Sequence, residues 1–334
     1  MALLELQEVT RHFELRPGIV ERAIRGGKTR VIKAVEAMNL SLTQDEILGI
    51  AGESGCGKST TCSMIAGLLP PSSGKVLYRD RDVGGMTEEE LKGHRRQVQM
   101  IFQDPYESLN PRFRISDIVS EGPRALGLWG EKEIEERVAD MLASVGLGPA
   151  KYWERYPHEL SGGERQRVGI ASALVMEPEL VVADEPLSML DVSIRAGILD
   201  LLRDLSQKRN FACVYVSHDL SILGNIADRL LIMYLGQAVE VGPVHEVINN
   251  PKHPYTRALI SAVPVPDPRA KRSPPNIVGD ISRPVDPPPG CRFISRCPYA
   301  DKSCSDFFVK LDTGSRLTHQ AACHRLDQIP DEAA

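Results

Sequence analysis

The chain has 334 residues, enough for about two domains, and its 42% hydrophobic and 25% charged residues are typical of a folded globular protein rather than a disordered one. The formal net charge of −5, from 40 basic and 45 acidic residues, argues against a protein held on nucleic acid by bulk charge. Because no apolar run approaches the roughly 20 residues of a membrane span and the first residues lack a signal-peptide pattern, we expect a cytosolic chain that meets any membrane through a partner or its surface.

The first hundred residues alternate between short apolar runs and turns, as strands and connecting helices do. Segment 14–33 is rich in Gly and Arg and is interpreted as an exposed loop or hairpin insertion. Thr87, with Glu90 three residues later, predicts a capping box that begins a charged helix. The expected elements are strands over 3–9, 38–42, 47–51, 76–78 and 98–102 and a helix from Ser59 to Leu69, stopped by Pro70.

The rest of the chain predicts an α/β fold with an inserted helical subdomain at about 104–178. Continuous apolar strands separated by helices indicate a mostly parallel sheet covered on both faces. Nine prolines fall within 264–289, which reads as an extended strap and divides the chain into 1–263 and 264–334. Helices are expected over 115–121, 131–145, 161–176, 191–208, 219–227 and 254–263, and strands over 180–184, 211–217, 229–235 and 237–242.

A phosphate-binding loop lies between the strand at 47–51 and the helix that follows it. Its pattern is G-x-x-x-x-G-K-[ST], in which glycines let backbone N–H groups surround phosphate oxygens at a helix N-terminus. Lys58 can reach the β- and γ-phosphates, and Ser59 can ligate Mg²⁺. The alternative is a chance Gly-rich turn. The residues of the loop and the start of its helix are Gly52, Glu53, Ser54, Gly55, Cys56, Gly57, Lys58, Ser59 and Thr60.

Two acids end the apolar strand LVVAD. Asp184 suits the Mg²⁺ shell, and Glu185 suits the base that polarises an attacking water. A carboxylate at the end of a buried strand is costly unless a cation meets it. The alternative is a strand-end acid that caps the next helix.

The segment Leu160 to Gln166, LSGGERQ, resembles the signature motif of ABC ATPases, and it lies between the phosphate loop and the acid pair as in that family. Taken alone, Ser161 with Glu164 is another capping box. The resemblance implies that Ser161, Gly162 and Gly163 face the γ-phosphate held by an opposite subunit, which agrees with a helix N-terminus free of bulky side chains. Hydrolysis then requires two subunits arranged head to tail.

The same resemblance assigns further residues. Gln103 resembles the Q-loop glutamine that contacts Mg²⁺ and senses the transmembrane partner, and Asp191 closes a D-loop that has Met189 where Ala is usual. His218 resembles the switch histidine, although a lone strand-end histidine is more often structural. Phe13 is the candidate for stacking on adenine, with a core or loop role as the alternative. The implied Mg²⁺ ligands are Ser59, Gln103 and Asp184.

Four cysteines crowd into the last part of the chain with the spacing Cys-x5-Cys-x6-Cys-x18-Cys. The spacing matches neither paired zinc knuckles nor a bacterial ferredoxin run. Four thiolates suit tetrahedral zinc or a cubane iron–sulfur cluster, and metal-free thiols or disulfides stay open. His324 is placed beside the ligands rather than among them. The cysteines are Cys291, Cys297, Cys304 and Cys323.

The segment from His253 to Pro264 and the motif G-C-x-F-x-x-R-C-P at 290–298 resemble the C-terminal extension of ATPases from oligopeptide and dipeptide ABC importers. That family implies an ABC-type ATPase with an antiparallel β subdomain, using ATP and Mg²⁺. Some of its members hold a [4Fe–4S] cluster on the four cysteines, and the resemblance favours that cluster here. It also implies a peripheral position on the cytoplasmic face of the membrane. The implied partners are a second, different ABC ATPase subunit, two transmembrane permeases and an extracytoplasmic solute-binding protein, with no nucleic acid.

Three alternatives remain open at this point. The same subunit could serve oligosaccharide or nickel uptake. A soluble ABC ATPase of DNA repair or translation is disfavoured by the single cassette, the absence of a heptad tract and the negative net charge. An iron–sulfur redox protein with an accessory nucleotide domain is disfavoured because the ferredoxin spacing is missing.

Overall fold

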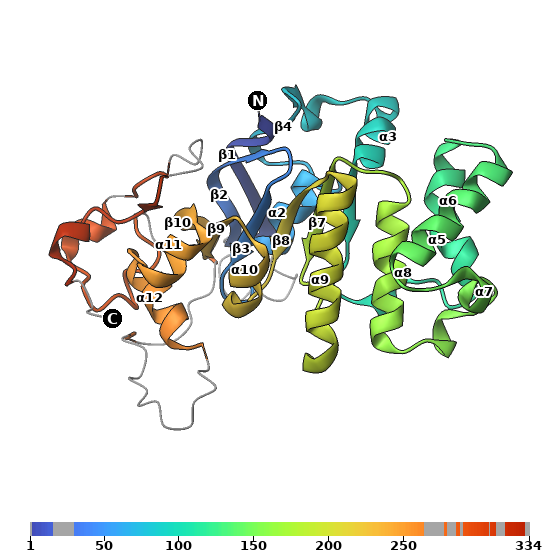
Figure 1. The fold of residues 1–334 in the computed structure, drawn as a ribbon. Coiled ribbons are helices and arrows are strands. Elements are labelled where there is room, and N and C mark those ends of the chain that lie inside the picture. The colour runs from blue at the N-terminus through green and yellow to red at the C-terminus, as the bar shows by residue number, and fades with distance from the viewer. Residues whose placement is uncertain are drawn as a thin grey trace, which may run out of the picture.

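The computed structural model describes residues 2–15, 30–263, 277–278, 285–287, 290–306, 308–311 and 318–330. Two sheets form its centre, a helical arm extends from one side, and the carboxyl-terminal segment lies on the other side (Figure 1). In the described ranges, no helix is both long enough and apolar enough to cross a membrane.

The smaller sheet is antiparallel and confirms the expected β subdomain. The first two strands pair along their whole length, and the pairing ends at Leu15 opposite Arg30. Both ends of segment 14–33 are therefore strand, as in a hairpin, while residues 16–29 lie outside the described residues. Its order is β2-β1-β4-β5, with β1 (Ala2–Leu15), β2 (Arg30–Thr43), β4 (Ser73–Tyr78) and β5 (Arg81–Asp82).

The larger sheet has seven strands in the order β11-β10-β9-β3-β8-β7-β6. Five neighbouring strands, β9-β3-β8-β7-β6, run parallel, and two antiparallel strands extend one edge. The mostly parallel sheet expected from the apolar runs is thus confirmed. The strands are β3 (Ile47–Ala51), β6 (Val98–Ile101), β7 (Leu180–Asp184), β8 (Ala212–Val216), β9 (Arg229–Tyr234), β10 (Gln237–Pro243) and β11 (Gln320–Ala321).

Alternate residues of the parallel strands serve two cores, because side chains along a strand point to opposite faces. On β7, Val181 and Ala183 belong to the buried cluster shared with the helical arm. Leu180 and Val182 belong to the cluster shared with the antiparallel sheet. The parallel sheet is therefore buried on both faces, and its strand ends are left to build a site at one edge.

Helices cover the sheet and form the arm between β6 and β7. Around the sheet they are α2 (Lys58–Ile65), α3 (Glu88–Gln97), α9 (Val192–Arg209), α10 (Leu220–Ile226), α11 (Val244–Asn249) and α12 (Pro254–Ser261). The arm contains α4 (Pro105–Ser108), α5 (Ile115–Leu126), α6 (Glu131–Ser144), α7 (Pro149–Tyr152) and α8 (Gly162–Leu174), all within the expected helical range. Short 3-10 turns are η1 (Val83–Gly85), η2 (Pro157–Glu159), η3 (Lys302–Ser305) and η4 (Leu326–Gln328).

One helix ends earlier than its sequence predicts. Helix α2 stops at Ile65, four residues before the expected end at Leu69. Gly67 adopts a left-handed φ of 68°, and the N–H of Leu68 donates to the carbonyl of Ser63 at 2.9 Å, which closes the last turn. The glycine, rather than Pro70, ends the helix. The capping box of α3 is confirmed, because both hydrogen bonds between Thr87 and Glu90 are present.

Candidate nucleotide-binding site

The predicted phosphate loop joins β3 to α2, at the carboxyl edge of the parallel sheet. Two of its glycines are required by close backbone approach. A Cβ on Gly57, which has a φ of 107°, would lie 2.1 Å from the carbonyl oxygen of Ala34, and a Cβ on Gly52 would lie 2.2 Å from that of Met233. The loop therefore packs against neighbouring strands in a way that no other residue type allows at these two positions.

Lys58 lies inside this loop with 5% of its surface exposed. Its Nζ donates to the carbonyl oxygens of Gly52 at 2.8 Å and of Glu53 at 3.1 Å. The same atom is 3.9 Å from Oε1 of Glu185. The loop thus holds a buried ammonium group beside the predicted catalytic acid, where phosphate oxygens can replace carbonyl partners.

Asp184 is buried beside Ser59 and carries an unpaired oxygen. Its Oδ1 has no hydrogen-bond partner within the described residues. Burial raises the pKa of this carboxyl group, although a hydrogen bond from Ser59 and the charge of Lys58 act in the opposite direction. A buried carboxylate oxygen next to a hydroxyl group is a donor set that suits Mg²⁺, so these two predicted ligands fit the ion.

Glu185 and His218 form the second polar pair of the site. Nδ1 of His218 is 3.0 Å from Oε2 of Glu185, whose side chain is 16% exposed against 60% for the histidine. Glu185 has a left-handed φ of 45°, and its N–H is fixed by the carbonyl of Val216 at 3.0 Å. The alternative of a capping acid does not hold, because Asp191 occupies the N-cap position of α9.

These groups surround a cavity of about 730 Å³. Phe13 lines it from β1, with the guanidinium carbon of Arg11 4.8 Å from its ring centroid. Two further lining residues of β2, Ile32 and Ala34, were not predicted. Ile32 falls in segment 14–33, interpreted as a loop or hairpin insertion, and Ala34 falls between that segment and the strand expected at 38–42. The predicted residues that line the cavity are Phe13, Ser54, Gly55, Gly57, Lys58, Ser59, Thr60, Gln103, Glu185 and His218.

The signature segment lies elsewhere, since none of the described residues that line the cavity belongs to it. The capping box expected from Ser161 is present: its N–H and Oγ both donate to Oε2 of Glu164, at 2.8 and 2.9 Å. A hydrogen bond from Tyr152, together with the bonds from Ser161, lowers the pKa of Glu164 to about 2. Ser161 itself is exposed, so the cap leaves the helix end open to another molecule.

The two signature glycines differ in their surroundings. A Cβ on Gly163 would lie 2.7 Å from Cγ2 of Ile194, so close packing of α8 on α9 explains this glycine. A Cβ on Gly162 would meet atoms only at 3.5 Å or more, which is ordinary contact. Internal packing therefore leaves Gly162 unexplained. Nearby, the predicted D-loop exposes 57% of Met189, with Asp191 also at the surface.

The four carboxyl-terminal cysteines all line one small pocket, together with Phe293 and His324. Burial and the neighbouring thiols raise the pKa of Cys291 to about 11. Among the described residues, one group of three or more ligand atoms lies within 4.8 Å of one another, that of Asp301, Cys304 and His324. The four cysteines therefore surround a common pocket, but no three of their sulfur atoms lie within 4.8 Å of one another in the described residues.

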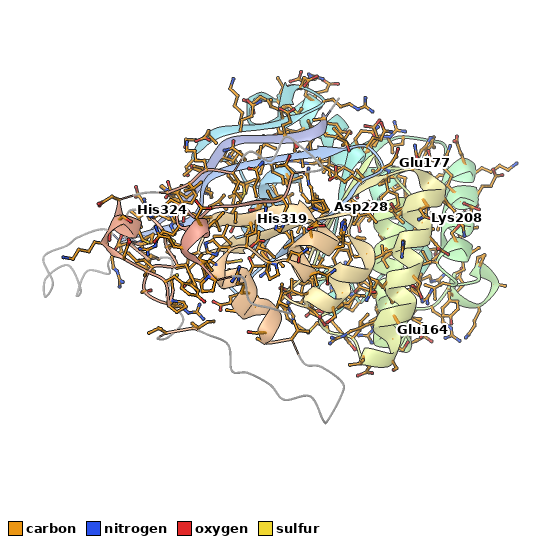
Figure 2. The ribbon with its side chains drawn as sticks, turned by 60° about the vertical axis from the view of Figure 1, so that its left-hand side comes forward. Glu164, Glu177, Lys208, Asp228, His319 and His324 are labelled. Atoms are coloured by element: carbon orange, nitrogen blue, oxygen red, sulfur yellow. The ribbon has the colours of Figure 1, made fainter. Side chains whose placement is uncertain are left out.

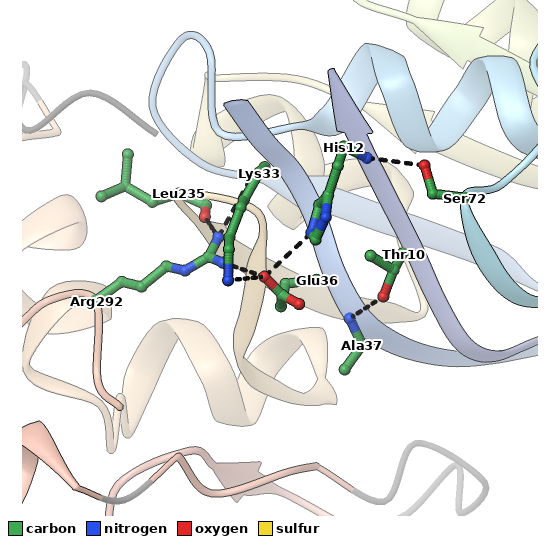
Figure 3. Close-up of polar contacts among 8 residues, drawn as sticks. All are labelled: Thr10, His12, Lys33, Glu36, Ala37, Ser72, Leu235 and Arg292. Atoms are coloured by element: carbon green, nitrogen blue, oxygen red, sulfur yellow. Dashed lines mark hydrogen bonds and ion pairs between the residues drawn. The ribbon is translucent and has the colours of Figure 1, made fainter. Parts of the chain in front are cut away.

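Arg292, beside the first of these cysteines, ties the segment to the antiparallel sheet (Figure 3). Its guanidinium group is 3% exposed, donates to Oε2 of Glu36 on β2 at 2.7 Å and also donates to the carbonyl of Leu235. Nε2 of His12 approaches the same carboxylate oxygen at 3.3 Å. No local sequence signal announces this contact, because its partners lie 256 residues apart.

Solved structures share this fold. The chain resembles a dimeric ATP-binding cassette, MJ0796, in a post-hydrolysis state bound to ADP and Pi, with a TM-score of 0.62 and 26% identity over 72% of this chain and 98% of that one. It resembles cbiO1 from Clostridium perfringens, part of the ABC transporter complex cbiONQ, with a TM-score of 0.62 and 27% identity over 75% and 91%. The fold and phosphate loop thus define a nucleotide-binding cassette with ATPase activity.

Sequence comparison gives the family. The ABC transporter model matches residues 35–188, and the model for the C-terminal region of oligopeptide/dipeptide transporters matches 239–304. The chain is 42% identical to the oligopeptide transport ATP-binding protein AppF of Bacillus subtilis (strain 168), over 96% of this chain and 97% of that protein. It is 42% identical to OppF of Escherichia coli (strain K12), over 98% and 97%. The chain therefore belongs to the ATP-binding subunits of oligopeptide/dipeptide ABC transporters.

Proposed function

We propose that this chain hydrolyses ATP to power the uptake of oligopeptides or dipeptides across the cytoplasmic membrane. The observation that carries the proposal is the meeting of Lys58, Glu185 and His218 around one cavity, beside the unpaired oxygen of Asp184. Relatives named for oligopeptide and di/tripeptide transport support the choice of solute. The division into a hydrolysing part, 1–263, and a cysteine-bearing part, 264–334, belongs to the same proposal.

In this mechanism the residues of the chain bind ATP and direct a water molecule. Lys58 and the N–H groups of the phosphate loop hold the phosphates, while Phe13 covers the adenine. Mg²⁺ bound by Ser59, Gln103 and Asp184 would neutralise phosphate charge. Glu185 accepts a proton from the attacking water, and His218, hydrogen-bonded to Glu185, holds the γ-phosphate.

The active unit in this proposal contains two ATPase subunits. Ser161 and Gly162 contact the γ-phosphate held by the partner: Ser161 is exposed, Gly162 is half-buried, and both lie away from this chain's own cavity. Asp191 lies at the same interface. We propose a different chain as the partner, two permeases that dock near Gln103, an extracytoplasmic solute-binding protein and a peripheral position on the cytoplasmic face of the membrane.

Substitution of the catalytic acid tests the ATPase assignment. In the purified complex, Glu185→Gln should keep MgATP binding and lose hydrolysis by roughly 100-fold or more, because the amide cannot accept the proton. Asp204→Asn, which changes an exposed carboxylate on α9, is the matched control and should hydrolyse ATP normally. Normal turnover of Glu185→Gln would refute the assignment.

The solute is tested separately in vesicles that contain the permeases and the binding protein. Di- and oligopeptides should stimulate ATP hydrolysis and accumulate inside the vesicles. Stimulation by an oligosaccharide or by nickel instead would replace the solute but keep the motor. Hydrolysis that never responds to permeases would support a non-transport ATPase.

We propose that the four cysteines hold a [4Fe–4S] cluster. Four cysteines that line one pocket would supply the four thiolate ligands of such a cluster. Cysteines bound to a shared cluster would also stabilise a segment that has little core of its own.

Anaerobic purification tests the cluster. The protein should contain iron and acid-labile sulfide in equal amounts, and Cys291→Ser should lose both, while Cys213→Ser, a buried cysteine outside the group, should keep them. A colourless protein with one zinc that survives Cys291→Ser would favour the group of Asp301, Cys304 and His324 instead.

A further inference from the structure

One arginine of the cysteine-bearing segment reaches the phosphate loop. Arg296, which precedes Cys297, has a side chain only 6% exposed. Its Nη1 donates to Oε2 of Glu53 at 2.9 Å and its Nη2 donates to Oε1 at 3.0 Å. Two parallel hydrogen bonds between guanidinium and carboxylate groups fix both orientation and distance, which a single contact does not.

Glu53 is the second residue of the phosphate loop, and three contacts converge on it. Its carbonyl oxygen accepts a hydrogen bond from Nζ of Lys58 at 3.1 Å, and its N–H donates to the hydroxyl group of Tyr255 at 2.9 Å. Its carboxylate takes the bidentate bonds from Arg296. The placement of one residue therefore links the cysteine-bearing segment to the lysine expected to bind phosphate.

Aromatic packing fixes the arginine from its own side. Phe293, three residues earlier, is 1% exposed, and its ring centroid lies 5.2 Å from that of Tyr234 and 5.4 Å from that of Tyr255. The hydroxyl group of Tyr234 also accepts a hydrogen bond from Nη1 of Arg296 at 3.4 Å. The contact of Phe293 with Tyr234, together with that of Arg292 with Glu36, anchors the segment on the cassette at points outside the phosphate loop, so Arg296 can act as a fixed support.

We infer that Arg296 is a positioning residue for the nucleotide: through Glu53 it holds the phosphate loop in the form that binds ATP. The inference rests on the proposed ATP-binding role of the cavity. Glu53 is not among the described residues that line this cavity, so its carboxylate is engaged by the arginine rather than by phosphate. The effect of Arg296 on ATP must therefore pass through the loop backbone and Lys58.

Binding of MgATP tests the inference in the complete chain. In a Glu185→Gln background, where hydrolysis is blocked, Arg296→Gln should raise the dissociation constant for MgATP roughly tenfold in calorimetry. Truncating one partner of a buried charge pair costs more free energy than a tenfold change in a dissociation constant represents, so part of that cost is enough to produce the effect. Arg257→Gln is the matched control. This arginine donates to the carbonyl of Pro330 in the same carboxyl-terminal region but makes no contact with the loop in the part of the chain that the structure describes, and its variant should bind MgATP within twofold of the parent.

A double-mutant cycle separates positioning from general stability. Glu53→Gln should weaken binding similarly, and the double variant should bind no worse than either single variant, because both act through one contact. Arg296→Lys, which keeps the charge but not the bidentate geometry, should rescue binding in part. If Arg296→Gln does not fold, Glu53→Gln and Arg296→Lys still test the inference.

Two results would overturn the inference. If Arg296→Gln lowers the melting temperature but binds MgATP as tightly as the parent, the arginine is only structural. If the effects of Arg296→Gln and Glu53→Gln simply add, the two residues do not act through each other. A parent protein that fails to bind MgATP would instead overturn the proposed function itself, and this inference with it.

Discussion

The nucleotide cavity and the carboxyl-terminal cysteine segment are built in different ways. Most groups of the cavity come from short motifs at the ends of parallel strands, so the topology of the sheet brings them together. In its described residues, the cysteine segment contains only β11 and two 3-10 turns, and buried arginines hold it on the cassette. Its two labelled histidines lie far from Glu164 of the helical arm (Figure 2).

Because the two regions are built differently, we expect substitutions in them to have different effects on activity and on stability. Motif residues are held mainly by the local structure around them and line the site, so changing them should alter activity more than stability. Arg292 and Arg296 make buried contacts between distant parts of the chain, and we call these contacts joints. Changing a joint residue such as Arg292 should lower stability more than activity.

The largest expected effect is on hydrolysis in the assembled transporter. Ser161→Asp places a negative charge at the helix end that we expect to meet the partner's γ-phosphate, and should lower turnover roughly 100-fold or more, in line with lost anion stabilisation. The measurement is the ATPase rate of the complex, with the melting temperature of the isolated subunit beside it.

Thr87→Asp is the control for this substitution, because Thr87 heads the same kind of capping box on α3. It loses the same hydroxyl group and gains the same charge. If both variants lose activity equally, the loss comes from the cap and the signature assignment is wrong.

Sequence alone anticipated the cavity well, for a physical reason. Each motif includes its own secondary structure, as in the strand, turn and helix around Lys58, and parallel strands bring their carboxyl ends to one edge. Even there, the extent of β2 was missed, because Ile32 lies in the segment 14–33 that is rich in Gly and Arg and Ala34 directly follows it, and the pairing of β1 with β2 overrides that composition.

The joints of the cysteine segment could not be anticipated in the same way. The contacts of Arg292 with Glu36 and of Arg296 with Glu53 span 256 and 243 residues. No periodicity encodes such a pair, and although Arg296 belongs to the motif at 290–298, nothing in the sequence names the partner of either arginine. The cysteines could be grouped from their crowding in sequence, but their wide spacing around one pocket required the structure.

The joint at Arg292 should give the largest effect on stability. Arg292→Gln removes a charge-assisted hydrogen bond from Glu36, which keeps Lys33 at 3.1 Å, and leaves the carbonyl of Leu235 without this donor. The two losses together should lower the free energy of unfolding by about 3–5 kcal/mol. Urea denaturation measures it. Lys310→Gln is the control, because Lys310 pairs with Glu8 between the same two regions but at the surface, where a change below about 1 kcal/mol is expected. Equal losses would contradict the distinction between buried and exposed joints.

His253 should make the same region sensitive to acid. Burial lowers the pKa of His253 to about 4, with Glu240 acting weakly in the opposite direction. Between the ordinary pKa near 6.5 and pH 4, the unfolded chain binds a proton that the folded chain does not. The free energy of unfolding should therefore fall as the pH is lowered through this window, by roughly 3 kcal/mol at about 1.4 kcal/mol per pKa unit.

His253→Asn tests this sensitivity. The side chain of His253 caps α12 by accepting a hydrogen bond from the N–H of Tyr255, and asparagine can cap a helix in the same way. The variant should lose the fall in stability between pH 6.5 and pH 4, measured by denaturation at several pH values. An unchanged slope would assign the acid sensitivity to other groups.

The smallest effect is expected at Glu164, a local contact of the signature helix. Hydrogen bonds from Tyr152 and Ser161 lower its pKa to about 2, so the stability they contribute is present above the ordinary pKa of 4.5 and is lost as the pH falls toward 2. Glu164→Gln should cost about 1 kcal/mol at neutral pH, as the loss of a helix cap does, and the difference from the parent should shrink between pH 4.5 and pH 2. Glu90→Gln alters the matching box of α3, where Arg81 takes the place of the tyrosine at the carboxylate, and should cost less. If Glu164→Gln instead destabilised the chain as much as Arg292→Gln, local motifs and distant joints would not differ in the way that the structure implies.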